Sequence, residues 1–209
     1  MCGFAIEVRR DGRADRDALE RMGAVLEPRG PDGSGVWVDR GVGMVHRRLA
    51  IIDLSELGAQ PMHDEAAGLT IVFNGCIYNH HELRGELIAL GHSFRSLSDT
   101  EVLLRGWVQW GEDLPSHLYG MFAFAIDDGA RTFLVRDRLG IKPLYLAEVD
   151  GALRAASTLP ALLAGGGVDT RVDPVALHHY LSWHSVVPAP RTILSGVRKL
   201  PPATIRFRS

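Results

Sequence analysis

The chain has 209 residues, of which 46% are hydrophobic and 23% are charged, and its formal net charge at pH 7 is −2. This length fits one large domain or a domain with a tail, and the small net charge excludes a general affinity for nucleic acid. No run of about 18 apolar residues and no secretion signal occurs, so we expect a cytoplasmic protein that has no membrane partner.

Hydrophobic patterns predict alternating strands and helices in the first half of the chain. The segment "GFAIEV" is an expected strand, and apolar residues at helical spacing from Ala18 to Leu26 predict a helix that ends near Pro28. The loop-forming segment 55–68 separates the last two of three further expected strands. These three strands cover residues 34–38, 43–52 and 69–74. Helices are expected over residues 79–90 and 99–110, with Ser98 and Glu101 forming a capping box before the second.

The second half begins with four short strand patterns separated by turn residues, as in an antiparallel meander. They are "MFAFAID", "TFLVRD", "PLYLAEV" and "LRAAS". A helix is expected in "DPVALHHYLSW", where Asp173 caps and Pro174 occupies the first turn. The proline-rich remainder predicts extended chain. We therefore divide the chain into a domain over residues 1–160 and a C-terminal helix and extended tail over residues 161–209.

Cys2 directly follows the initiator methionine. Loss of Met1, expected before a small residue, leaves Cys2 with both a thiol and a free α-amine. Such an amine has an unperturbed pKa of about 7.7–8.0 and can accept the thiol proton and later return one, which suits amide hydrolysis through a thioester. The alternative is that Cys2 is a small buried hydrophobic residue. The terminus alone does not decide between the two interpretations.

Several motifs then follow one another in order. They are "MCGFA", "RGPDGSG", "HRRLAIIDLSELGAQPM", "FNGCIYNHHELR", "SDTEVLLRGW", "GMFAFAI" and "RDRLGIKPLY". Up to about Ser157 the chain closely resembles the glutaminase domain of asparagine synthase-type class II glutamine amidotransferases, which are N-terminal nucleophile hydrolases. The resemblance implies an α+β fold, a four-layer αββα sandwich of two antiparallel sheets with helices outside, which the predicted elements support.

The resemblance also implies roles for individual residues. Cys2 is expected to attack the glutamine side-chain amide, while the Asn74 side chain and the Gly75 backbone N–H stabilise the oxyanion. By itself, "NG" would instead predict a hairpin turn. Arg48 corresponds to the arginine that pairs with the glutamine α-carboxylate, and Asp99 to the acid that receives its ammonium. An aspartate at a helix start is otherwise commonly a cap.

Other charged or glycine-rich motifs are interpreted as structural. Residues 29–32, "RGPD", are expected to organise the loop over the site. Residues 136–145, "RDRLGIKPLY", are expected to form a charged turn that supports the interior or the face toward a partner domain. The segment "AGGGVDT" resembles the phosphate loop of a synthetase domain only superficially, because Ala164 stands at its first serine, and it is interpreted as a glycine turn.

One position departs from the family pattern. The usual run is Asn-Gly-Glu-Ile-Tyr-Asn, and this chain has "NGCIYN", so Cys76 stands where an acid commonly helps to hold the substrate ammonium. A charge-assisted hydrogen bond contributes roughly 1.5–3 kcal/mol, so either glutamine binds more weakly or Asp99 compensates. Cys76 and the segment "ALHHYLSWHSVVPAPRTILSGVRKLPPAT" resemble the N-acetylglutaminylglutamine amidotransferase branch.

Full enzymes of this family continue into an ATP-dependent synthetase domain. The resemblance therefore implies glutamine as substrate, and a synthetase domain or partner chain that uses the released ammonia in an asparagine synthase-like amidation. ATP and Mg are expected only in that domain, and no cofactor or metal is expected in this chain. A homodimer is left open. The alternative function is a non-catalytic glutamine-sensing or regulatory module of the same fold.

Overall fold

The computed structural model describes residues 2–208. Its strands form two sheets, one of six strands in the order β10-β8-β9-β1-β3-β2 and one of five in the order β11-β7-β6-β5-β4. All pairings between these strands are antiparallel. The six-stranded sheet contains β1 (Gly3–Val8), β2 (Gly33–Asp39), β3 (Val42–Arg48), β8 (Tyr145–Val149), β9 (Ala152–Ala156) and β10 (Arg198–Lys199). The five-stranded sheet contains β4 (Met62–Asp64), β5 (Leu69–Ile77), β6 (Gly120–Asp127), β7 (Thr132–Arg136) and β11 (Thr204–Arg208).

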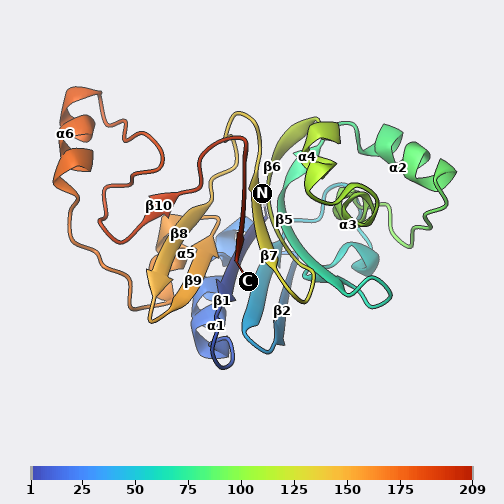
Figure 1. Ribbon diagram of the computed structural model, residues 1–209, viewed down its shortest axis with the longest axis horizontal. Helices are drawn as coiled ribbons and strands as arrows, with labels where there is room; N and C mark the ends of the chain where they lie inside the picture. Colours follow the sequence, from blue (N-terminus) through green and yellow to red (C-terminus); the bar gives the residue numbers. More distant parts are fainter. Residues whose placement is uncertain (1, 209) are drawn as a thin grey trace.

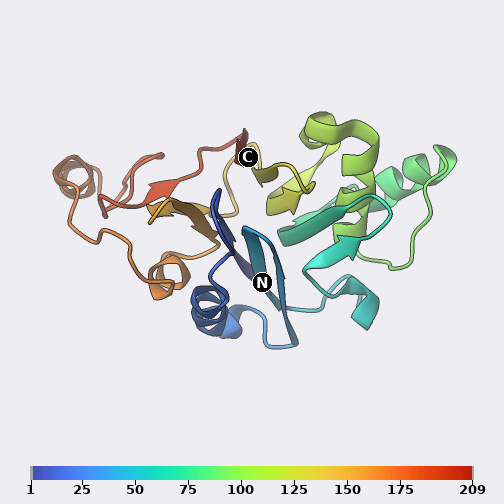
Figure 2. The same ribbon diagram turned by 60° about the horizontal axis from the view of Figure 1, so that its bottom comes forward.

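The two sheets pack face to face, and helices cover their outer faces (Figures 1 and 2). Strand alternation turns Phe4, Ile6 and Met44 of one sheet toward Val72 and Leu134 of the other, and these residues form the central apolar layer. The six-stranded sheet packs on α1 (Arg16–Val25) and α5 (Leu159–Ala164), and the five-stranded sheet on α2 (His80–Ala89), α3 (Asp99–Trp110) and α4 (Leu114–His117). The predicted αββα sandwich is confirmed.

The boundaries of two strands differ from the predictions, and both differences affect the cavity described below. β3 ends at Arg48, so residues 49–52 are loop rather than strand. β5 continues to Ile77, so Asn74 and Gly75 lie inside the strand rather than at its end or just after it. The predicted loop over 55–68 also contains the short strand β4, which pairs only with residues Leu69 to Ile71 of β5.

The predicted meander is wrong as a single unit. β6 and β7 form a hairpin in the five-stranded sheet, whereas β8 and β9 form a hairpin in the six-stranded sheet. The turn between Arg136 and Tyr145 carries the chain from one sheet to the other. A strand pattern alone does not reveal such a change of sheet, because both hairpins have the same alternation.

The capping box before α3 is also wrong in part. The Ser98 side chain does cap the helix by accepting from the N–H of Thr100 at 3.0 Å. Glu101, however, does not return to Ser98, because its carboxylate accepts from the backbone N–H groups of Arg95 and Ser96. Glu101 therefore fixes the loop that leads into α3.

The C-terminal segment adds strands to both sheets. α6 (Pro174–Ser182) begins as predicted, with the Asp173 carboxylate accepting from Val175 and Ala176. The tail after it contains β10, which pairs with β8, and β11, which pairs with β7. Within residues 2–208, no helix is both long and apolar enough to cross a membrane.

Candidate active site

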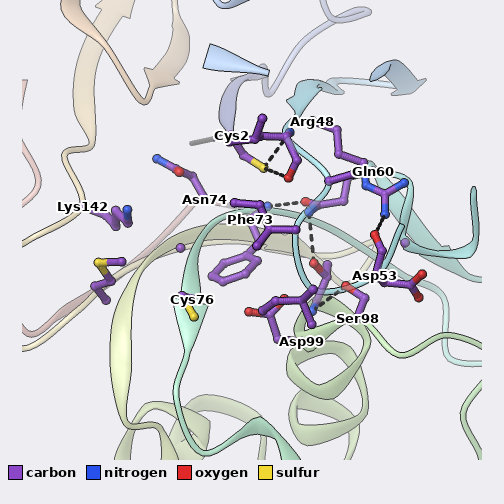
Figure 3. Close-up of a pocket in the computed structure, with 18 residues that line it drawn as sticks. Cys2, Arg48, Asp53, Gln60, Phe73, Asn74, Cys76, Ser98, Asp99 and Lys142 are labelled. Atoms are coloured by element: carbon purple, nitrogen blue, oxygen red, sulfur yellow. Dashed lines mark hydrogen bonds between the residues drawn. The ribbon is translucent and has the colours of Figure 1, made fainter. Parts of the chain in front are cut away.

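A cavity of about 270 Å³ lies where the start of β1, the end of β3, the middle of β5 and the start of α3 meet. All six residues proposed from the sequence line it, namely Cys2, Arg48, Asn74, Gly75, Cys76 and Asp99. In Figure 3, Cys2 and Arg48 lie at one end of the group, and Asp99 and Cys76 lie at the other. The fold thus brings together side chains that are up to 97 positions apart in sequence.

Cys2 is held by the loop that follows β3. Its sulfur accepts from the backbone N–H of Leu49 at 3.3 Å, and its thiol lies 3.6 Å from the Leu49 carbonyl oxygen. Its own carbonyl oxygen accepts from Nε of Arg29 at 3.1 Å. Asp32 fixes the same loop by accepting from the N–H of Ala50. The "RGPD" segment therefore organises this side of the cavity.

The edge of β5 that faces the cavity is open beyond the short β4. Two side chains accept hydrogen bonds from this edge. The N–H of Phe73 donates to Gln60 Oε1 at 2.7 Å, and the N–H of Ile77 donates to Asp99 Oδ2 at 3.1 Å. Backbone N–H groups in a strand alternate between its two edges, so the N–H of Gly75 faces the same open edge, between these two anchors. Among residues 2–208, no neighbouring strand covers this donor.

Asn74 supplies a second polar group. Asn74 is 1% exposed, and neither its side-chain oxygen nor its side-chain nitrogen has a hydrogen-bond partner among residues 2–208. An unpaired buried amide is costly, of the order of 1–3 kcal/mol, and such groups in native proteins commonly have a functional reason. Asn74 lines the same cavity as Cys2 (Figure 3).

Arg48 is the last residue of β3 and lies against the following loop. Its guanidinium donates to the backbone carbonyl oxygens of Asp53 and, at 2.8 Å, of Ser55. A Cβ atom on Gly58 would lie 2.5 Å from Arg48, so glycine provides room for the guanidinium there. Arg47 points to the opposite face, as strand alternation predicts, and donates to Gly23 O in α1.

Burial shapes the electrostatics near Asp99. Desolvation raises the pKa of Asp99 to about 6, although backbone N–H groups, including that of Ile77, favour its ionised form. Burial also raises the pKa of the Cys76 thiol, and the nearby Asp99 carboxylate adds to this effect. Cys76 is therefore a neutral thiol at neutral pH, and it brings no negative charge to this end of the cavity.

Asp53 also lines the cavity, and both of its carboxylate oxygens accept hydrogen bonds from neighbouring loop residues. One oxygen accepts from the Ser55 hydroxyl at 2.7 Å, and the other accepts from the N–H of Leu97 at 2.8 Å. Hydrogen bonds hold the pKa of Asp53 below its usual range, and the one from the Ser55 hydroxyl has the largest effect. Asp53 thus joins the loop after β3 to the loop before α3.

Sequence reasoning missed three residues at or behind the cavity. Gln60, placed in a surface loop by its polar surroundings, bridges the Phe73 N–H and the Thr100 hydroxyl. Lys142, assigned to a structural turn, lines the cavity and is 2% exposed. His46 is fully buried, and its Nε2 donates to the Phe73 carbonyl oxygen at 3.1 Å. Of the three, only His46 could have been found from the sequence, because strand alternation places it on the same face as Arg48.

Burial keeps His46 neutral. It lowers the pKa of the imidazole to about 4, the nearby Arg48 acts in the same direction, and Nδ1 has no partner within the described chain. The hydrogen bond from His46 in one sheet to Phe73 in the other fixes the strand residue that precedes Asn74. His46 therefore supports the cavity from the central layer.

Comparison with known proteins identifies the family. The profile of the glutamine amidotransferase domain matches residues 1–208. The chain is 37% identical over 209 residues to asparagine synthetase (glutamine-hydrolyzing) 3 of Bacillus subtilis, a match that covers 97% of this chain and 34% of that protein. It is 39% identical over 210 residues to asparagine synthetase (glutamine-hydrolyzing) 1 of the same organism, covering 98% and 33%. The chain thus spans about one third of the length of these relatives.

Solved structures agree on the fold. The glutamine phosphoribosylpyrophosphate amidotransferase of Bacillus subtilis superposes with a TM-score of 0.67 at 20% identity, covering 83% of this chain and 46% of that one. An allosteric regulatory enzyme of purine biosynthesis superposes with a TM-score of 0.73 at 19% identity, covering 99% and 46%. These likenesses confirm the N-terminal nucleophile hydrolase fold. The match of the domain profile to residues 1–208 shows that the chain belongs to the glutamine amidotransferase domain family.

Proposed function

We propose that this domain hydrolyses the side-chain amide of glutamine through a thioester on Cys2 and releases glutamate and ammonia. The observation that carries the proposal is the shared cavity of the Cys2 thiol and the unpaired Asn74 amide. A nucleophile beside an unused buried amide and an open-edge N–H is the arrangement that acyl transfer requires.

The first half of the reaction forms the thioester. After loss of Met1, the α-amine of Cys2 accepts the thiol proton and the sulfur attacks the amide carbon. The Asn74 side-chain N–H and the Gly75 backbone N–H stabilise the negative charge that develops on the amide oxygen. The carbon–nitrogen bond then breaks, and the α-amine returns the proton to the departing ammonia.

The second half releases glutamate. A water molecule gives a proton to the α-amine and attacks the thioester carbon, and the same donors stabilise the second oxyanion. Cleavage of the carbon–sulfur bond returns the proton to the Cys2 sulfur and frees the glutamate carboxyl group. The α-amine thus acts twice as base and twice as acid.

The remaining cavity residues fit the polar ends of a free amino acid. Arg48 can pair with the α-carboxylate through N–H groups of its planar guanidinium. Asp99, ionised above its pKa of about 6, can receive the α-ammonium. Cys76 gives this end a neutral thiol in place of a second acid, so the recognition of the ammonium depends on Asp99.

We further propose that the ammonia serves an ATP-dependent amidation. The similar Bacillus subtilis proteins are glutamine-hydrolysing asparagine synthetases about three times as long as the matched region. A synthetase domain or partner chain would hold ATP and Mg, while the glutaminase step needs only the side chains described here. The N-acetylglutaminylglutamine branch remains our hypothesis for the acceptor, and the cytoplasm our hypothesis for the location.

The test is glutamate release from glutamine by the purified chain, with intact mass to establish that Met1 is removed. Cys2→Ala should abolish the activity, and Cys76→Ala, which keeps the nucleophile, should retain it. Glutamine binding without hydrolysis in the folded, processed chain would reject the proposal in favour of the glutamine-sensing module. Activity that survives Cys2→Ala would reject the thioester.

A further inference from the structure

The turn between β7 and β8 fixes the backbone of Lys142 from two sides. The Lys142 N–H donates to Asp137 Oδ2 at 2.9 Å, and the Lys142 carbonyl oxygen accepts from Arg136 Nε at 2.7 Å. Asp137 also accepts from the N–H groups of Phe122 and Ile141. These buried contacts determine where the Lys142 side chain starts and in which direction it leaves the turn.

The Lys142 side chain enters the cavity, although burial of an ammonium is unfavourable. The residue is 2% exposed and lines the cavity, at the left of the group in Figure 3. Burial lowers the pKa of Lys142 and Arg29 adds to this, whereas Cys76, Asp137 and Cys2 oppose it. Lysine is seldom buried unless its charge is used or paired.

We propose that Lys142 is a positioning residue of the glutaminase reaction, whose positive charge keeps the α-amine of Cys2 unprotonated and favours the ionised thiol. A cation close to an amine disfavours its protonated form, and a cation close to a thiol favours the thiolate. Both effects act in the direction that the nucleophile and its base require. The turn motif "RDRLGIKPLY" thereby gains a role in the reaction.

Other charged or titratable groups belong to several elements around Lys142 and Cys2. Those that line the cavity are Arg48 of β3, Asp53 of the following loop, Cys76 of β5 and Asp99 of α3. Arg29 before β2 donates to the Cys2 carbonyl oxygen, and Asp137 of the turn accepts from the Lys142 N–H. Arg29 acts in the same direction as Lys142, because its guanidinium holds the Cys2 carbonyl group. The carboxylates act in the opposite direction, and burial raises the pKa of Asp99 to about 6.

The inference rests on the proposed function for the α-amine as base, but the state of the thiol can be measured without turnover. In a Cys76→Ala background, Cys2 is the only cysteine of the chain. The rate of its alkylation by iodoacetamide, followed by mass spectrometry from pH 5 to 10, reports the ionised thiol. Lys142→Met should move the midpoint of this profile upward by about one pH unit, and thus slow alkylation at pH 7 about tenfold.

The second readout is the pH profile of kcat/KM for glutamine in the chain that retains Cys76. Lys142→Met should move the midpoint of its acid limb upward by about one unit, and Lys142→Arg should restore it. Lys199→Met is the matched control, because Lys199 is a half-buried lysine that donates to Val187 O away from this cavity. It should leave both profiles unchanged. Lys142→Gln removes the same charge with a polar side chain, so the test does not depend on tolerance of methionine.

Two results would overturn the inference. Unchanged profiles in a folded Lys142→Met or Lys142→Gln protein would show that the charge does not act on Cys2. A raised KM with an unchanged alkylation profile would instead make Lys142 a substrate-binding residue. Neither result concerns the thioester itself, which Cys2→Ala tests, so failure of this inference is distinguishable from failure of the proposed function.

Discussion

The Asp99 carboxylate accepts a hydrogen bond from the backbone N–H of Ile77 at 3.1 Å, and so one side chain both covers the open edge of β5 and lines the cavity. Asp99 is 5% exposed, and desolvation raises its pKa to about 6. The hydrogen bond to the strand therefore holds Asp99 in place, and burial makes its ionised form energetically unfavourable.

Asp99→Asn should stabilise the fold at neutral pH. The folded protein binds the Asp99 proton more tightly than the unfolded chain, so between pH 3.8 and about 6 the stability contributed by this group falls as pH rises. Asparagine has no charge to bury and retains an oxygen for Ile77, so the free energy of unfolding at pH 7 should rise by about 1–2 kcal/mol. Urea unfolding at pH 7 and pH 3.5 checks this, since the gain should vanish at the lower pH.

The affinity for glutamine should fall below pH 6. Protonation of Asp99 removes the charge that faces the substrate ammonium, so KM should rise about tenfold for each pH unit below about 6 and stay level above it. KM measured from pH 4.5 to 8 provides the test. In Asp99→Asn this dependence should disappear at a uniformly high KM. A similar pH dependence in that variant would mean that another group receives the ammonium.

Asn74→Ala should lower the activity strongly and change the stability of the fold only slightly. Loss of one oxyanion donor is expected to lower kcat about 10²- to 10³-fold. The free energy of unfolding should fall by no more than about 1 kcal/mol, because the side-chain amide makes no hydrogen bond within residues 2–208. Steady-state kinetics measure kcat, and urea unfolding of the same preparation measures the free energy of unfolding. A large loss of stability would indicate a structural amide.

Cys76→Glu should tighten glutamine binding. The thiol is neutral, and a carboxylate at the same position adds a charge-assisted hydrogen bond that contributes roughly 1.5–3 kcal/mol, so KM should fall about tenfold or more. Cys76→Gln has the same size without the charge and serves as the control in the same kinetic assay. Equal effects of the two substitutions would attribute the change to packing rather than to charge.

The sequence alone predicted the architecture and selected residues that line one cavity. The alternation in "GFAIEV" places Phe4 and Ile6 between the sheets, and helical spacing predicts α1, α2 and α3 close to their observed bounds. The ordered motifs selected six residues that line one cavity. Local patterns succeed here because side-chain direction in a strand or helix depends on near neighbours in the chain.

The tertiary structure decided what these residues can do. β4 is too short to cover β5, which leaves the Gly75 N–H on an open edge, and the turn after Arg136 changes sheets, which brings Lys142 into the cavity that Cys2 also lines. Burial raises the pKa of Asp99 and leaves the Asn74 amide unpaired. Such properties depend on the solvent and charges around each group, and these are set by segments far apart in sequence. The sequence by itself therefore selected residues that line one cavity, and the packing of the two sheets determined their charge and their free hydrogen-bonding groups.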